Sequence, residues 1–201
     1  MRRVLVAVLV AICIVPAEAL ARTILVVGDS LSAAHGMELR AGWVSLLRAR
    51  LAEQKLDYRI VNASVSGDTT ASAAARLPRL LEEHRPDIVI LELGGNDGLR
   101  GLSPARIKHN LSVMIAKTRA ADAKVLLVGI ELPPNYGRKY TERFRRVYRE
   151  LATEQQVALV PSIMEGFATD RALMQPDGIH PNARAQPRML ENVWGQLWPM
   201  L

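Results

Sequence analysis

Five short apolar runs, separated by longer segments of helical character, constrain this chain more than any other feature. The runs are rich in Val, Ile and Leu and alternate little, which is typical of strands covered on both faces of a sheet. They occupy residues 23–28, 58–62, 87–93, 124–130 and 157–160. The helical segments lie at residues 42–54, 69–83, 103–121, 139–155 and 182–197.

The regular alternation of strands and helices predicts a parallel sheet with helices on both of its faces. Right-handed crossovers between parallel strands leave few possible topologies for such a chain. We therefore predict an α/β fold, a three-layer α/β/α sandwich of the flavodoxin-like kind with a five-stranded parallel sheet. The sequence contains no internal repeat, low-complexity tract or long linker, so we expect residues 22–201 to form a single domain.

The N-terminal segment has the pattern of a cleaved secretory signal. Two arginines precede an apolar run at residues 4–15, and small residues surround Ala19 and Ala21. The run is too short for a comfortable membrane span. Cleavage after Ala19 and cleavage after Ala21 both fit this pattern, and we favour Ala21 because the first predicted strand starts at about residue 23. We therefore predict a signal peptide at residues 1–21 and a periplasmic or secreted protein.

Cysteine count and charge exclude several classes of function. The only cysteine, Cys13, lies in the predicted signal peptide, so the mature chain would have neither a disulfide nor a cysteine nucleophile. The formal net charge is +6, and it would fall to about +5 after cleavage. This mild charge, without a basic nucleic-acid-binding module, predicts no nucleic-acid partner. The arginine-rich stretch at residues 138–149 reads first as a solvated helix face and second as a contact for anionic membrane lipids.

Polar, glycine-punctuated loops follow four of the predicted strands. They cover residues 28–30, 62–70, 94–98 and 177–182. Ligand sites of open parallel sheets lie at the carboxyl ends of the strands, so these loops should meet at one edge. Each loop taken alone is more often an ordinary turn. Together they supply a hydroxyl, an imidazole, a carboxylate, an amide and backbone N–H groups, the set that acyl transfer at a serine needs.

The residues of these loops suggest specific roles. Ser30 would be the nucleophile, His180 the general base and then acid, and Asp177 the group that orients His180. The backbone N–H groups of Ser30 and Gly67 and the side chain of Asn96 would form an oxyanion hole.

Other polar residues carry weaker signals. Asp29 would support the nucleophile turn by accepting hydrogen bonds from backbone N–H groups. His35 lies near Ser30 in sequence but has no acid to orient it, and His84 and His109 fall at a helix exit and within a helix. The scattered histidines and the absence of known ligand motifs predict no metal and no cofactor.

The four loops together resemble the SGNH hydrolases, also called the GDSL lipase/esterase family. The matching blocks read GDSLS from Gly28, NASVSGDT from Asn62, LGGNDG from Leu93 and DGIHPN from Asp177. They stand in the family's order and span nearly the whole mature chain. The resemblance implies that Ser30, Gly67, Asn96 and His180 are the four signature residues, with Asp177 completing the triad. It also implies a five-stranded parallel sheet between helices and no cofactor.

The resemblance further implies a serine esterase that acts on small acyl esters and thioesters, including acyl-CoA, aryl esters and lysophospholipids. We expect a monomer. An acyl groove could be lined by residues 99–102, residues 132–136 and Ile179, with Leu99 and Leu102 as named candidates. A carbohydrate O-deacetylase with the same triad is an alternative, although only nine aromatic residues are available for stacking on sugars. A non-catalytic binding module on a flavodoxin-like scaffold is the third interpretation.

Overall fold

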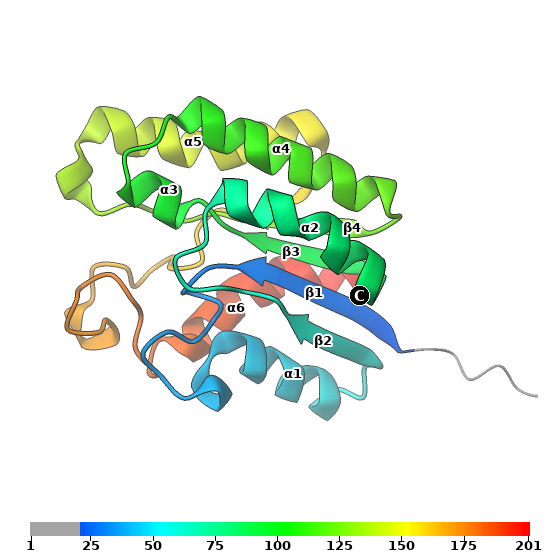
Figure 1. Ribbon diagram of the computed structural model, residues 1–201. Helices are drawn as coiled ribbons and strands as arrows, with labels where there is room; N and C mark the ends of the chain where they lie inside the picture. The colour runs from blue at the N-terminus through cyan, green and yellow to red at the C-terminus, as the bar shows by residue number, and fades with distance from the viewer. Residues whose placement is uncertain (1–20) are drawn as a thin grey trace, which may run out of the picture.

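A five-stranded, all-parallel sheet forms the centre of the computed structural model, which describes residues 21–201 (Figure 1). The strands lie in the order β2-β1-β3-β4-β5. Their bounds are β1 (Arg22–Gly28), β2 (Tyr58–Asn62), β3 (Ile88–Glu92), β4 (Lys124–Val128) and β5 (Ala158–Val160). The predicted flavodoxin-like sheet is thus confirmed in strand number, direction and approximate bounds.

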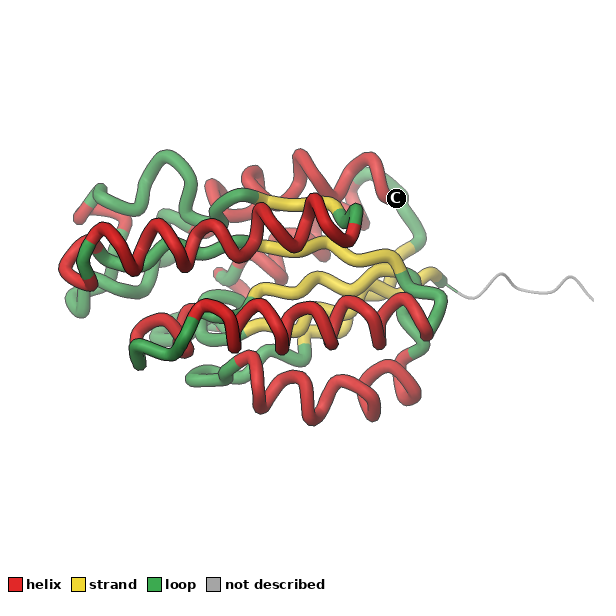
Figure 2. The backbone as a smooth tube through the Cα atoms, turned by 90° about the horizontal axis from the view of Figure 1, so that it is seen from above, coloured by secondary structure: helices red, strands yellow, loops and turns green. Residues whose placement is uncertain are grey.

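Helices cover both faces of the sheet and complete the three layers (Figures 1 and 2). On one face lie α1 (Trp43–Glu53) and α6 (Gln186–Leu197), and on the other lie α2 (Thr70–His84), α4 (Pro104–Ala120) and α5 (Arg138–Gln155). A one-turn helix, α3 (Gly95–Leu99), follows β3 directly. Short 3₁₀ turns are η1 (Leu39–Ala41), η2 (Pro134–Tyr136), η3 (Arg171–Leu173) and η4 (Trp198–Met200). No helix within residues 21–201 is long and apolar enough to cross a membrane.

Burial explains why the strands lack alternation. All five residues of β3 are buried, and the central residues of β1, Ile24 to Val27, have no exposed surface. The helices contribute one apolar face each, as Leu77 and Leu81 do on α2. Because both faces of the central strands are covered, β1 and β3 are free to present polar groups only at their ends.

Two helices differ from the prediction made from the sequence. The short helix α3 is not predicted, because Gly95, Asn96 and Gly98 are poor helix formers and their pattern indicates a loop. Helix α6 begins at Gln186 rather than at residue 182. Asn182 instead forms a turn, in which its Oδ1 accepts from Arg184 N and its Nδ2 donates to Ala172 O, at 2.9 Å in both cases.

The strand order places the switch point of the topology between β1 and β3. The chain passes from β1 to the outer strand β2 and then returns to β3 on the other side of β1. The carboxyl ends of these strands point to the edge where the loop of residues 161–185 also lies (Figure 1). Ligand sites of such folds form at this position. The predicted signal peptide, apart from Ala21, lies outside the described residues.

Candidate active site

Ser30 lies in a tight turn two residues beyond the end of β1. Asp29 O accepts from Ala33 N at 2.9 Å, and Ser30 O accepts from His35 N at 3.2 Å, which closes the turn. A Cβ atom on Gly28 would lie 2.8 Å from Glu92 Oε2 and from the side chain of Ser32. Only glycine therefore lets the strand tip pack this closely and hold the Ser30 hydroxyl at the edge of the sheet.

The structure brings Ser30, His180 and Asp177 into one hydrogen-bonded series. Ser30 Oγ lies 2.9 Å from His180 Nε2, and His180 Nδ1 lies 2.7 Å from Asp177 Oδ2. An ionised carboxylate only accepts hydrogen bonds, so the Nδ1 proton faces Asp177 and Nε2 is free to accept the Ser30 proton. Residues 150 positions apart in the sequence thus meet at one point.

The D-G-I-H spacing has a clear geometric reason. Asp177 Oδ1 accepts hydrogen bonds from the backbone N–H groups of Ile179 at 2.9 Å and His180 at 3.0 Å. Gly178 has a φ of +67°, a left-handed conformation that favours glycine. Although partial burial opposes it, the hydrogen bonds from the backbone and side chain of His180 and from Ile179 N lower the pKa of Asp177 to about 2.

The three candidate oxyanion donors lie on neighbouring loops. Across residues 21–201, the backbone N–H groups of Ser30 and Gly67 donate to no other protein group, so both are available to a ligand. Asn96 Nδ2 donates to Asp68 O at 2.9 Å and to Asp29 Oδ2 at 3.1 Å. Asn96 therefore ties the loop after β2 to the Ser30 turn. It would have to exchange one of these bonds, of which the one to Asp29 is longer, to reach an oxyanion.

Two buried carboxyl groups stand directly behind the Ser30 turn. Burial raises the pKa of Asp29 to about 6, even though its Oδ1 accepts from Leu31 N at 3.0 Å. Glu92 has no exposed surface, and burial together with the charge of Asp29 raises its pKa well above the usual value. Glu92 Oε2 accepts from Ser32 Oγ at 2.7 Å. A carboxyl group within an apolar strand thus supports the turn, which the sequence pattern did not indicate.

A cleft of about 1090 Å³ opens at the series of Ser30, His180 and Asp177. Two of the named pocket candidates, Leu99 and Ile179, line it, whereas Leu102 lies outside the set of lining residues. The remaining apolar lining comes mainly from the loop after β4 and from the segment before Asp177, namely Ile130, Leu132, Pro133, Pro134, Met164, Ala168, Met174 and Pro176. The chemistry of this lining suits an apolar chain lying beside the Ser30 hydroxyl.

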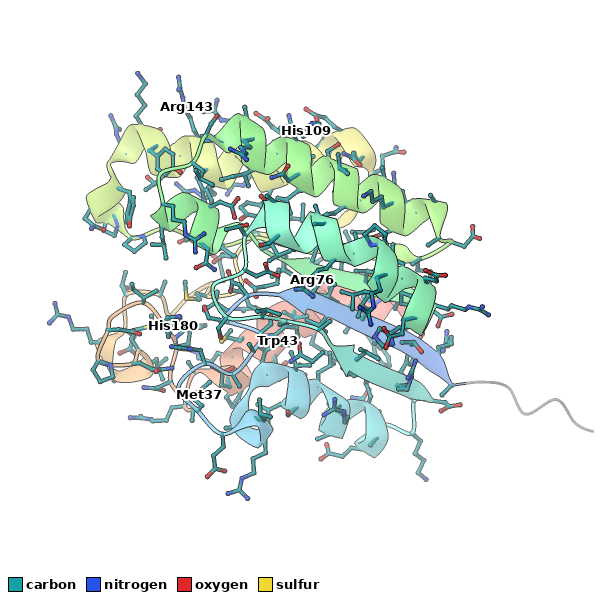
Figure 3. All side chains as sticks on the ribbon, in the orientation of Figure 1. Met37, Trp43, Arg76, His109, Arg143 and His180 are labelled. Atoms are coloured by element: carbon teal, nitrogen blue, oxygen red, sulfur yellow. The ribbon has the colours of Figure 1, made fainter. Side chains whose placement is uncertain are left out.

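The other histidines divide into one near the site and two away from it. The ring of His35 packs on the ring of His180, with centroids 4.5 Å apart. His84 and His109 lie at the end of α2 and on α4, and Figure 3 shows His109 far from the loop that carries His180. Residues 21–201 contain no cluster of three or more His, Cys, Asp or Glu side chains that could hold a metal ion.

A serine, an imidazole and a carboxylate in hydrogen-bonded series are the arrangement that serine hydrolases use. The chain belongs to the GDSL-like lipase/acylhydrolase family, whose profile matches residues 26–186. It is 54% identical to the esterase TesA of Pseudomonas aeruginosa over 201 residues, the full length of both chains.

Two further comparisons agree with the family. The chain is 45% identical to the thioesterase 1/protease 1/lysophospholipase L1 of Escherichia coli strain K12, over 91% of this chain and 86% of that protein. A crystal structure of TesA superposes with a TM-score of 0.88 at 57% identity, covering 90% of this chain and all of that one. The family resemblance that the four loops indicated is therefore confirmed.

Proposed function

We propose that this protein is a serine esterase and thioesterase that forms an acyl-enzyme on Ser30. The observation that carries the proposal is the 2.9 Å separation of Ser30 Oγ and His180 Nε2, in series with the 2.7 Å contact to Asp177. Ser30 Oγ would bond to the acyl carbon while its proton passes to His180 Nε2. Asp177, whose pKa is about 2, stays ionised and stabilises the imidazolium that forms.

The same groups act in both halves of the reaction. Acylation ends when His180 gives its proton to the leaving alcohol or thiol as the bond from the acyl carbon to oxygen or sulfur breaks. Water then attacks the acyl-enzyme, its proton passes to Nε2, and the Ser30 oxygen leaves with that proton. The free N–H groups of Ser30 and Gly67, with Asn96, would stabilise the negative oxygen in both halves.

The cleft and the relatives together suggest the substrate class. Aliphatic side chains and prolines form the apolar part of the cleft wall, and an acyl chain buries its methylene groups favourably against that part. The relatives are named as an esterase and as a thioesterase and lysophospholipase. Acyl-CoA, aryl esters and lysophospholipids are therefore the substrates we propose.

Hydrolysis of p-nitrophenyl acetate, butyrate, octanoate and palmitate, with palmitoyl-CoA alongside, tests this function. The wild type should cleave medium or long chains, and Ser30→Ala should lose activity by about a million-fold. The matched control is Ser103→Ala, since Ser103 is exposed and its side chain makes no capping hydrogen bond. If Ser30→Ala and the wild type are equally active or equally inert, the proposal fails. Cleavage of the acetate alone would favour an O-deacetylase instead.

We also propose that residues 1–21 are a cleaved signal peptide and that residues 22–201 work as a monomeric periplasmic or secreted domain. Strand β1 begins at Arg22, directly after the proposed cleavage site. N-terminal sequencing of the exported protein should give Arg22 as the first residue. Sedimentation at micromolar concentration should give the mass of one chain. A first residue other than Arg22 or a dimer mass would contradict the respective part.

A further inference from the structure

A closed ring of hydrogen bonds connects the two loops that carry Ser30 and His180. Ser30 O accepts from His35 N at 3.2 Å, and His35 O accepts from Gln175 Nε2 at 2.8 Å. His180 O accepts from Gln175 N at 2.7 Å, and the contact between His180 Nε2 and Ser30 Oγ closes the ring. We propose that His35 and Gln175 are positioning residues that hold the imidazole of His180 in register with the Ser30 hydroxyl. This inference rests on the proposed function of the same site.

Gln175 uses every one of its nitrogen donors in this connection. Besides its bonds to His35 and His180, its Nε2 donates to Pro181 O at 3.1 Å. Gln175 O accepts from Gly178 N at 2.9 Å, so the turn that contains Asp177 is also anchored to it. The side chain of Gln175 therefore contacts both His35, on the turn that carries Ser30, and Pro181, the residue directly after His180.

Hydrogen bonds rather than apolar packing support this loop. Besides the bonds of Gln175, Asn182 N donates to Leu173 O at 2.8 Å and Asn182 Nδ2 donates to Met174 O at 3.2 Å. Residues 176–179 are all exposed, so apolar burial contributes little to their position. Gly36 has a φ of +70°, and a Cβ atom there would overlap Gln175 Oε1. A glycine at position 36 thus lets the Gln175 side chain lie against the Ser30 turn, which indicates that this contact is built closely.

His35 adds a contact between side chains to the ring of hydrogen bonds. Its imidazole packs on that of His180 at 4.5 Å between centroids and at an interplanar angle of 41°. The side chain of His180 is only 19% exposed, whereas that of Asp177 beside it is 42% exposed. His35 therefore covers one face of the His180 imidazole and restricts rotation of that ring away from Ser30.

Such restriction matters because His180 must pass a proton to and from Nε2 while it keeps its bond to Asp177. Displacement of a reacting group by about 1 Å can cost about 100-fold in rate, even when the substrate still binds. Loss of a positioning contact should accordingly lower kcat and leave KM nearly unchanged.

Steady-state kinetics of four variants test the inference. Gln175→Met keeps the length of the side chain and removes the Nε2 donors to His35 O and Pro181 O, while the backbone bond to His180 O remains. We expect kcat to fall about 10- to 100-fold with KM within about twofold. His35→Ala should lower kcat about 3- to 10-fold, and His35→Phe should restore it by returning a ring to the same place. His109→Ala, an exposed histidine on α4, should match the wild type.

A second readout separates positioning from folding. The rate at which an ethyl p-nitrophenyl phosphonate modifies Ser30 depends on His180 but not on turnover, so it should fall in parallel with kcat. Thermal unfolding shows whether each variant is folded at the assay temperature. Unchanged kcat and phosphonylation rate in folded Gln175→Met overturn the role of Gln175. Loss in His35→Phe as large as in His35→Ala overturns the packing role of His35. Activity in Ser30→Ala would instead overturn the proposed function itself.

Discussion

Asp29 and Asp177 flank the same hydrogen bond between Ser30 and His180, yet their surroundings differ in every respect. Asp29 is 2% exposed, lies on the buried turn after β1, and has a pKa raised by burial to about 6. Asp177 lies on an exposed loop, and hydrogen bonds from His180 and Ile179 outweigh its partial burial and lower its pKa to about 2. One acid belongs to a packed support and the other to a solvated loop.

The two acids therefore have different roles in the same site, one structural and one electrostatic. Removal from water disfavours ionisation of Asp29, so its main contribution is geometric, through Leu31 N and Asn96 Nδ2. Asp177 is held by three N–H donors that favour its charged form, so it can stabilise an imidazolium at any pH above about 2. The buried side fixes the nucleophile, and the exposed side supplies the fixed negative charge.

Replacing each acid by its amide tests these two roles most directly. Asp177→Asn removes the charge that stabilises the imidazolium and permits the wrong tautomer of His180, so kcat should fall about 1,000- to 10,000-fold. Asp29→Asn keeps an oxygen that accepts from Leu31 N and loses the acceptor for Asn96 Nδ2. Because Asn96 Nδ2 still donates to Asp68 O, the loss should be about tenfold. Ester hydrolysis measured at about pH 8 compares the two. Equal losses would show that both acids act through their charge.

The second test compares the two sides through their glycines. A Cβ on Gly28 would meet Glu92 and Ser32 at 2.8 Å inside the packed turn, so Gly28→Ala should destabilise the fold by about 3 kcal/mol. A Cβ on Gly178 would meet nothing within 4 Å, and only its φ of +67° is strained, so Gly178→Ala should cost about 1 kcal/mol. Urea unfolding of both variants measures the difference. A larger cost at Gly178 would mean that the loop, not the turn, is the more tightly packed side.

The sequence predicted the packed frame of this site better than its connections. The bounds of the strands and main helices were predicted to within a few residues. Short continuous runs of Val, Ile and Leu are typical of strands buried on both faces. The loops that carry Ser30, Asn96 and His180 were placed at one edge by the parallel topology alone. These features follow from local patterns and a general rule of fold geometry.

The connections between loops have no such pattern. Gln175 meets His35 across 140 positions, and nothing in the residues around either one indicates the contact. Glu92 follows four apolar residues in β3, and its burial depends on the Ser32 hydroxyl 60 positions earlier. The role of a lone polar residue in a strand or loop depends on the hydrogen-bond partners that the tertiary structure brings to it. A single sequence therefore could not identify these supports.

Glu92 gives a pH-dependent test of the packed side. Its pKa in the folded protein is raised well above 4.5, so the folded state holds a proton that the unfolded state releases as the pH rises. Stability is therefore greatest below about pH 4.5 with respect to this group, and it falls as the pH rises toward the folded pKa. Glu92→Gln keeps an oxygen that can accept from Ser32 Oγ and removes the titration.

The expected result is that the variant gains stability relative to the wild type as the pH increases. The carboxyl groups of Asp29 and Glu92 interact and titrate as a pair, so the difference in slope between the variant and the wild type reports the proton that this pair holds in the folded state. Thermal unfolding between about pH 6.5 and about pH 9 measures it, with Glu165→Gln, an exposed acid, as the matched control. Curves that run parallel for wild type and Glu92→Gln would show that Glu92 is ionised behind the Ser30 turn. The turn would then hold a buried charge, and the contrast with the solvated Asp177 would be one of exposure alone.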